Sequence, residues 1–192
     1  ENMLSRFSEI DGEGKLVTKG NPKIIYASMM KSRTALLEYA SAALLRCTAI
    51  AIRYSMIRKQ FKDEKKHEIP VISYQLQQYR LFPLLAKSYA MRCAFAKILE
   101  VINHCNKEIE NNNFSHLQEA HVILSGAKAF YTWWCSNGLW VTMNCCGGHG
   151  YLKSSGITHL METTMPNTIL EGENTMLSLQ VGAFLLKCMK KI

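Results

Sequence analysis

A run of apolar residues at helical spacing, free of proline from residue 23 to residue 69, most constrains what this chain can fold into. Its members are Ile25, Met29, Leu36, Leu37, Leu44, Leu45, Ile52 and Ile57. At 1.5 Å per residue, a helix over these residues and on to about Phe61 is roughly 55 to 60 Å long. A helix of that length has to lie against neighbours, so the sequence predicts a domain of packed helices.

The ends of the first two helices follow from proline and asparagine. Asn21 is expected to cap the first helix, with Pro22 as its first helical residue. Pro70 is expected to start a second helix, which bends at Pro83 and ends at the run Asn111–Asn113. The polar residues between the two helices predict a surface loop.

Two further helices are expected in the second half of the chain. The capping-box pattern Ser115–Gln118 predicts the start of a third helix, which ends near Met143 where a glycine-rich loop breaks it. Asn174 or Thr175 is expected to cap a fourth helix that runs to Lys191.

Three long helices and a shorter one, joined by loops, predict an all-α fold, an antiparallel four-helix bundle. Residues 21–192 form this bundle domain. Residues 1–20, with a turn at Asp11–Gly14, are expected to be an extension outside the bundle, and strand content is expected to be near zero after them. Because the first residue is Glu1, we expect the chain to be part of a longer polypeptide.

The composition limits the classes of binding partner that the protein is expected to have. The formal net charge is +8 over 192 residues, but the basic residues are spread along the chain, so nucleic acid is not an expected partner. Such a charge suits attraction of a phosphorylated small ligand. No apolar stretch reaches about 18 residues without a charge, so no membrane span is expected. The seven cysteines show no CxxC spacing and are expected to be reduced thiols of an intracellular protein.

Two short segments near the C-terminus carry candidate chemistry: Cys146–Tyr151, with Gly147 and Gly148, and Leu170–Thr175, with Glu171. Glycine lets a backbone approach a ligand closely, and a carboxylate beside glycine at a helix entrance is a candidate base. Together they indicate a cofactor-dependent enzyme. The structural alternatives are a glycine turn that ends a helix and an acidic residue that complements a helix dipole.

Four segments in order along the chain carry a family pattern: Ile52–Phe61, Tyr74–Ala86, Cys146–Tyr151 and Glu171–Thr175. Together they resemble the acyl-CoA oxidases, the flavoenzymes of peroxisomal fatty-acid β-oxidation. The related acyl-CoA dehydrogenases share the arginine, Gly-Gly and Glu-Gly elements but typically lack the Gln-Gln-Tyr-x-Leu-Phe-Pro segment and the Gly-Glu-Asn-Thr ending. The resemblance spans nearly the whole chain, which corresponds to only the helical-bundle part of such an oxidase. It implies that residues 1–20 are the end of a preceding β-domain.

The resemblance implies that Glu171 is the catalytic base, which removes the α-proton of an acyl-CoA thioester while a hydride passes to flavin. A base of this kind needs a water-poor pocket aligned with the carbon acid. Glu173 is interpreted as an acidic residue of the first helical turn. The chain departs from the family at Leu170, where an aromatic residue that shapes the flavin and acyl pocket is usual.

The resemblance also assigns cofactor and substrate residues. Gly147 and Gly148 match a loop whose backbone approaches the FAD pyrophosphate of a neighbouring subunit, and Arg58 matches an arginine that reaches the partner's FAD phosphates. A solvated arginine at a helix end is the structural alternative for Arg58. Phe61 resembles an aromatic neighbour of that cofactor, and Arg33 aligns with an arginine near the acyl-CoA pocket.

The sequence therefore predicts part of an FAD-dependent acyl-CoA oxidase, a peroxisomal homodimer that forms trans-2-enoyl-CoA and H2O2. The alternatives are an acyl-CoA dehydrogenase with a protein electron acceptor, and a catalytically silent helical interaction module. No metal site is expected, because His149, Cys145 and Cys146 lack a second ligand pair at structural-zinc spacing. The chain alone is expected to bind little FAD and to be inactive.

Overall fold

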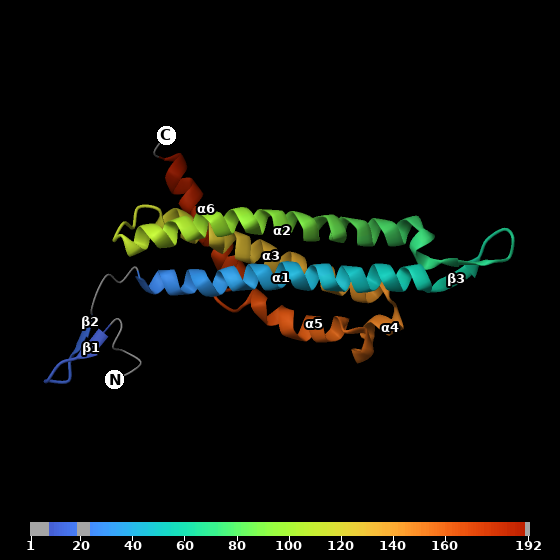
Figure 1. Ribbon diagram of the computed structural model, residues 1–192, viewed down its shortest axis with the longest axis horizontal. Helices are drawn as coiled ribbons and strands as arrows, with labels where there is room; N and C mark the ends of the chain where they lie inside the picture. The colour runs from blue at the N-terminus through green and yellow to red at the C-terminus, as the bar shows by residue number, and fades with distance from the viewer. Residues whose placement is uncertain (1–7, 19–23, 191–192) are drawn as a thin grey trace.

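Three long helices lie side by side in the computed structural model, which describes residues 8–18 and 24–190 (Figure 1). They are α1 (Ile24–Ile57), α2 (Gln75–Glu110) and α3 (Leu117–Cys145). Helices α1 and α3 run in the same direction and α2 runs antiparallel to both. The predicted all-α class is confirmed, whereas the predicted start at Asn21 and Pro22 lies outside the described residues.

Shorter elements complete the chain. The strands are β1 (Ser8–Ile10), β2 (Leu16–Thr18), β3 (Lys59–Lys62) and β4 (Glu68–Pro70). The shorter helices are α4 (Gly148–Tyr151), α5 (Ile157–Thr164) and α6 (Asn174–Met189), with 3-10 turns at Val71–Ser73, Lys153–Ser155 and Met165–Thr168. Strands β1 and β2 pair antiparallel around the predicted turn, where the Asp11 carboxylate accepts hydrogen bonds from the Glu13 and Lys15 amides.

The core lies where α1 meets α3. The buried face of α1 repeats every three or four residues, as a helix packed on one side requires. Leu37, Ala40, Leu44, Cys47 and Ala51 are all fully buried. A side chain at Gly138 of α3 would overlap the Leu44 side chain, so the two helices approach closely at this point.

Part of α1, Met29–Ile57, is long and apolar enough to cross a membrane, with a mean hydropathy of 1.5. Length and hydropathy alone do not separate a membrane-spanning helix from the central helix of a bundle. The buried face of this segment supplies a large part of the core, which is what the central helix of a bundle shows.

The first helix ends at Ile57, four residues before the predicted end at Phe61, which has a φ of 60° that helical backbone does not allow. Strands β3 and β4 then form an antiparallel hairpin. Its turn is closed by the Asp63 carboxylate, which accepts a hydrogen bond from the His67 amide at 2.8 Å. The expectation of almost no strand after residue 20 is therefore wrong, because local turn chemistry pairs the polar segment with itself.

The predicted starts of the second and third helices are also displaced. Pro70 has extended backbone, with φ −58° and ψ 139°, and α2 begins only at Gln75 after a 3-10 turn. Helix α2 continues through Pro83, where the bend stays a prediction. Helix α3 begins without a side-chain cap, so the capping box of Ser115 is not formed. The Asn113 side chain instead accepts the Ser115 amide hydrogen and turns the chain before the helix.

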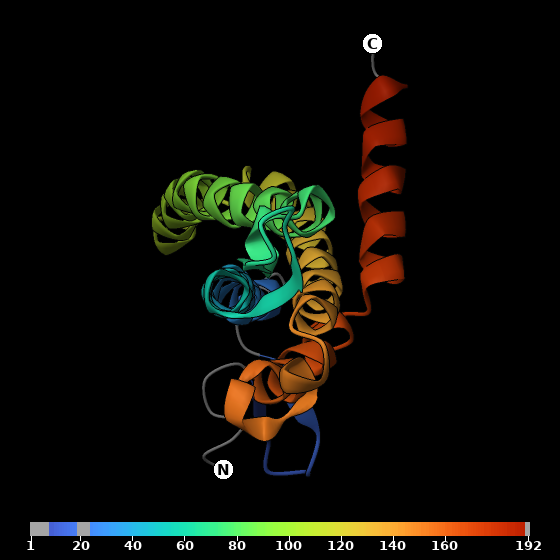
Figure 2. The ribbon, with the colours of Figure 1, turned by 90° about the vertical axis from the view of Figure 1, so that its right-hand side faces the viewer.

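Helix α6 crosses the long helices steeply and projects away from them (Figure 2). Its N-cap is Glu173, one residue before the predicted cap, and the Glu173 carboxylate accepts hydrogen bonds from the Thr175 and Met176 amides. The hydrogen bond from the Thr175 amide lowers the pKa of Glu173. The first-turn interpretation of Glu173 matches this geometry, whereas Asn174 is buried and its side chain bonds elsewhere.

We expect Gly150→Ala to destabilise the domain by about 1–3 kcal/mol, because a Cβ there would overlap the backbone carbonyl of Met143, which cannot move aside as a side chain can. Gly182→Ala is the matched control, since a Cβ at Gly182 meets no atom within 4 Å. That variant should be neutral or stabilising by up to about 1 kcal/mol. Urea denaturation of both variants measures the difference, and equal stability would contradict the close packing of α4 on α3.

Candidate functional site

Glu171 lies in the loop between the last 3-10 turn and α6, in a backbone conformation that side chains seldom adopt. Its φ is 58°, and Gly172 follows at 111°. Such backbone persists only where surrounding contacts hold it. The Glu171 side chain is half-buried, and its carboxylate has no hydrogen-bond or ion-pair partner within residues 8–18 and 24–190.

Arg33 of α1 holds the loop from one side. Its Nε donates a hydrogen bond to the Glu171 carbonyl oxygen at 2.9 Å. One terminal nitrogen donates to Ser125 Oγ at 3.0 Å and faces His121 Nδ1 at 3.4 Å. The arginine is only 3% exposed. Burial lowers the pKa of Arg33, and the nearby charge of Glu171 acts in the opposite direction.

Lys128 of α3 holds the next peptide. It is fully buried, and its Nζ donates hydrogen bonds to the Gly172 carbonyl oxygen at 2.6 Å and to Asn174 Oδ1 at 2.9 Å. Burial, and after it the charge of Arg33, lower the pKa of Lys128 to about 8, against the opposing effect of the Glu173 and Glu171 carboxylates. Two buried cations from different helices thus bind successive carbonyl groups.

Asn174 connects this loop to the base of α6. Its amide nitrogen donates to Thr132 Oγ1 at 2.9 Å and to the Ala129 carbonyl oxygen at 3.3 Å, both on α3. Its oxygen accepts from Lys128, so the buried side chain is satisfied on both sides. The start of α6 is therefore fixed against α3 directly beside Glu171.

The glycine-rich segment lies at the other end of α3. Gly147 has φ 58° and ψ −143°, a conformation that glycine adopts readily and other residues avoid. A Cβ at Gly147 or Gly148 would meet no atom within 4 Å. The described chain thus gives a conformational reason for Gly147 and no packing reason for Gly148, whose surroundings are open to a ligand or partner.

Hydrogen bonds connect the glycine-rich segment to the end of α1, where Arg58 lies. The Tyr54 hydroxyl lies 3.0 Å from His149 Nδ1, and the Gln77 amide donates to both the Cys145 carbonyl oxygen and Ser55 Oγ at 2.9 Å. Arg58 is exposed and donates to the Gln60 side chain at 3.0 Å. Phe61, on β3, is 71% exposed.

The sequence-predicted residues therefore fall into two places. Arg33 and Glu171 are in contact, and Gly147, Gly148 and Arg58 gather at the far end of the bundle. Lys128 and Cys145 are 17 residues apart on α3, which separates the two places by roughly 25 Å.

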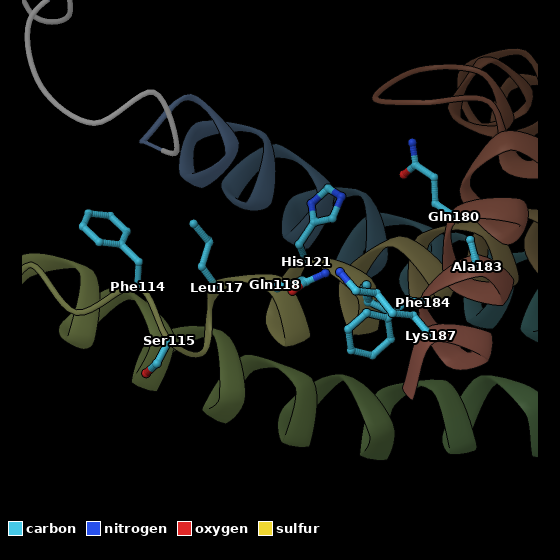
Figure 3. Close-up of a pocket in the computed structure, with 10 residues that line it drawn as sticks. Phe114, Ser115, Leu117, Gln118, His121, Gln180, Ala183, Phe184 and Lys187 are labelled. Atoms are coloured by element: carbon cyan, nitrogen blue, oxygen red, sulfur yellow. The ribbon is translucent and has the colours of Figure 1, made fainter. Parts of the chain in front are cut away.

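A groove of about 770 Å³ opens between α3 and α6, next to His121 (Figure 3). It is lined by Phe114, Ser115, Leu117, Gln118, His121, Val122, Gln180, Ala183, Phe184 and Lys187. None of the sequence-predicted site residues lines it, although His121 also faces Arg33. Burial and the charge of Arg33 lower the pKa of His121.

Sequence reasoning gave no site role to Lys128 or Ser125, and it did not foresee the buried contacts of Asn174 and Gln77. A signal for Lys128 existed, because it falls on the buried stripe of α3 between Leu124 and Tyr131. Within the described ranges, no group of three or more histidine, cysteine or acidic side chains could hold a metal ion.

Residues 26–186 match the family described as acyl-CoA oxidase, C-alpha1 domain. The match covers most of the chain, and the chain belongs to this family. Mouse peroxisomal acyl-coenzyme A oxidase 1 is 38% identical over 97% of this chain, which spans 28% of the mouse protein.

Solved structures show the same fold. Acyl-CoA oxidase 1 of Arabidopsis thaliana superposes with a TM-score of 0.90 at 36% identity, over 97% of this chain and 29% of that protein. Acyl-CoA oxidase-2 of Caenorhabditis elegans, solved with FAD, ascaroside-CoA and ATP, gives 0.87 at 30% identity, over 96% of this chain and 28% of that one. The chain thus spans less than a third of the length of each relative.

The buried lysine predicts a pH dependence of stability. The pKa of Lys128 falls from 10.5 in the unfolded chain to about 8 in the folded chain. Between these pH values the unfolded chain binds more protons than the folded chain, so the free energy of unfolding rises with pH. Between pH 7.5 and 9.5, we expect the free energy of unfolding of the wild type to rise by about 1–2 kcal/mol relative to that of Lys128→Met. Urea denaturation of both proteins at the two pH values measures it, and a constant difference would contradict this prediction.

Proposed function

We propose that the chain is the part of an FAD-dependent acyl-CoA oxidase that carries the catalytic base, Glu171. The observation that carries the proposal is the half-buried carboxylate of Glu171, which has no hydrogen-bond or ion-pair partner among the described residues and lies on a loop fixed by Arg33 and Lys128. A base held on a rigid loop is prealigned with its carbon acid, which lowers the entropic part of the barrier. The mouse relative is named a peroxisomal acyl-coenzyme A oxidase, and we assign the same compartment and reaction class.

In this reaction Glu171 would take the α-proton of the acyl-CoA thioester. Bound FAD would supply the acceptor for the β-hydride and the route of the electrons to O2, so that the reaction would yield trans-2-enoyl-CoA and H2O2. Leu170, next to the base, is 53% exposed and would form part of the wall of the flavin and acyl pocket. Arg33 is buried and adjacent to the base, and it exposes almost no surface to a ligand. Its contact with the acyl-CoA substrate therefore stays a prediction.

The far end of the bundle fits the diphosphate part of FAD. The open surroundings of Gly147 and Gly148 allow close approach of a phosphate to the backbone, and the exposed guanidinium of Arg58 can bind it through two N–H groups. Exposed Phe61 lies on the adjacent strand. Because this end of the bundle lies far from Glu171 in the same chain, we infer that the glycine-rich segment and Arg58 bind the FAD of the second subunit of a homodimer.

The decisive test is hydrogen peroxide release by the full-length parent protein, loaded with FAD, on medium and long acyl-CoA substrates. Glu171→Gln should lower the rate by about 10² to 10⁴-fold, because it removes the proton acceptor and keeps the shape of the side chain. Flavin absorbance should be unchanged.

Each contrary outcome selects an alternative. A flavin-loaded wild type that reduces its flavin but releases no peroxide indicates a dehydrogenase with a protein acceptor. A full-length protein that takes up no flavin indicates a helical interaction module.

We expect the chain by itself to bind little FAD and to release no peroxide, because it spans only 28% of the mouse enzyme's length. Absorbance near the flavin bands after reconstitution and desalting measures the bound fraction. Stoichiometric flavin on the isolated chain would contradict this prediction.

A further inference from the structure

Lys128 is a buried cation in an unusual setting. Its side chain is fully buried in α3, and no carboxylate forms an ion pair with it in the part of the chain that the structure describes. Removing an ammonium group from water is costly unless hydrogen bonds compensate it. A methionine or leucine would fill the same space without that cost, so packing alone does not account for a lysine here.

What the lysine adds over an apolar residue is its N–H donors. The two acceptors that they reach, the Gly172 carbonyl oxygen and Asn174 Oδ1, both lie within three residues of Glu171. Arg33 reaches the preceding carbonyl group, that of Glu171 itself, at 2.9 Å. Rotation of either peptide would take one of its acceptors away from a buried cation, so the pair favours the backbone at the positive φ of Glu171 and Gly172.

We propose that Lys128 is a positioning residue for the base: from α3 it fixes the Gly172 carbonyl group, and so sets where the Glu171 carboxylate is presented. This inference rests on the proposed function, in which Glu171 is the base. Lys128 itself does not touch the substrate, because it has no exposed surface.

The charges that act on Lys128 come from α1 and from the loop that leads into α6. Arg33 approaches from α1, and the Glu171 and Glu173 carboxylates from the loop and the start of α6. On α3, His121 faces Arg33 rather than the lysine. Burial lowers the pKa of Lys128 to about 8, but even an uncharged amine keeps two N–H groups for its two acceptors. The hold on the loop therefore depends mainly on donor geometry.

The test compares Lys128→Met with Thr142→Val in the full-length, flavin-loaded parent protein. Thr142 is a fully buried residue of the same helix, about 20 Å from Lys128, whose hydroxyl donates to the Leu139 carbonyl oxygen within α3. The first measurement is amide hydrogen exchange of a peptide that covers residues 170–175. We expect at least about tenfold faster exchange there in Lys128→Met and no change in Thr142→Val.

The second measurement is the rate of anaerobic flavin reduction by acyl-CoA per bound flavin. It should fall by about 10 to 100-fold in Lys128→Met, with the substrate dissociation constant within about twofold of the wild type. Lys128→Gln, which keeps an N–H donor, should recover part of the rate. It also serves as the test variant if Lys128→Met fails to load flavin.

Unchanged exchange at residues 170–175 would overturn the proposal, and so would faster exchange with an unchanged reduction rate. Equal losses in Lys128→Met and Thr142→Val would also overturn it, because they would show a general effect on the fold. A wild type whose flavin no acyl-CoA reduces would overturn the proposed function, while the exchange comparison would still decide separately whether Lys128 holds the loop.

Discussion

Two buried cations that form no ion pair with a carboxylate in the described part of the chain need other oxygen acceptors, and this need organises the second half of the molecule. Arg33 and Lys128 obtain them from consecutive carbonyl groups of one loop. Because the cations sit on α1 and α3, the loop can bind both only when those helices keep their spacing, which the contact of Gly138 with Leu44 also requires. The direction in which α6 leaves the bundle follows from the same contacts, through Asn174.

The long helices could be predicted from sequence because each carries a continuous apolar stripe. Their ends could not be, because short-range hydrogen bonds decide them. The Asp63 carboxylate closes a hairpin where a loop was expected, and the Asn113 side chain turns the chain before α3. The start of the fourth helix could not be predicted for a different reason. Tertiary contacts bury the Asn174 side chain, so Glu173 caps the helix in its place.

The short motifs around Glu171, Gly147 and Gly148 could be found from sequence, while the roles proposed for these residues stay predictions. Their support could not, since it comes from residues 40 or more positions away in the chain. Lysines are usually predicted to be exposed to solvent. Only the position of Lys128 among the buried residues of α3 indicates that this lysine is buried. The roles assigned to Arg33, Arg58 and Phe61 depend on ligands and subunits beyond this chain.

The glycine-rich segment carries two glycines under opposite demands. Gly150 is constrained by the backbone of α3 in its own chain, whereas a Cβ at Gly148 would meet no atom of a more distant described residue within 4 Å. A set of substitutions compared by folding stability would detect a change at Gly150 and miss a change at Gly148, although the two glycines are only two residues apart. Tolerance of a side chain in the isolated domain is therefore no guide to tolerance in an assembled enzyme.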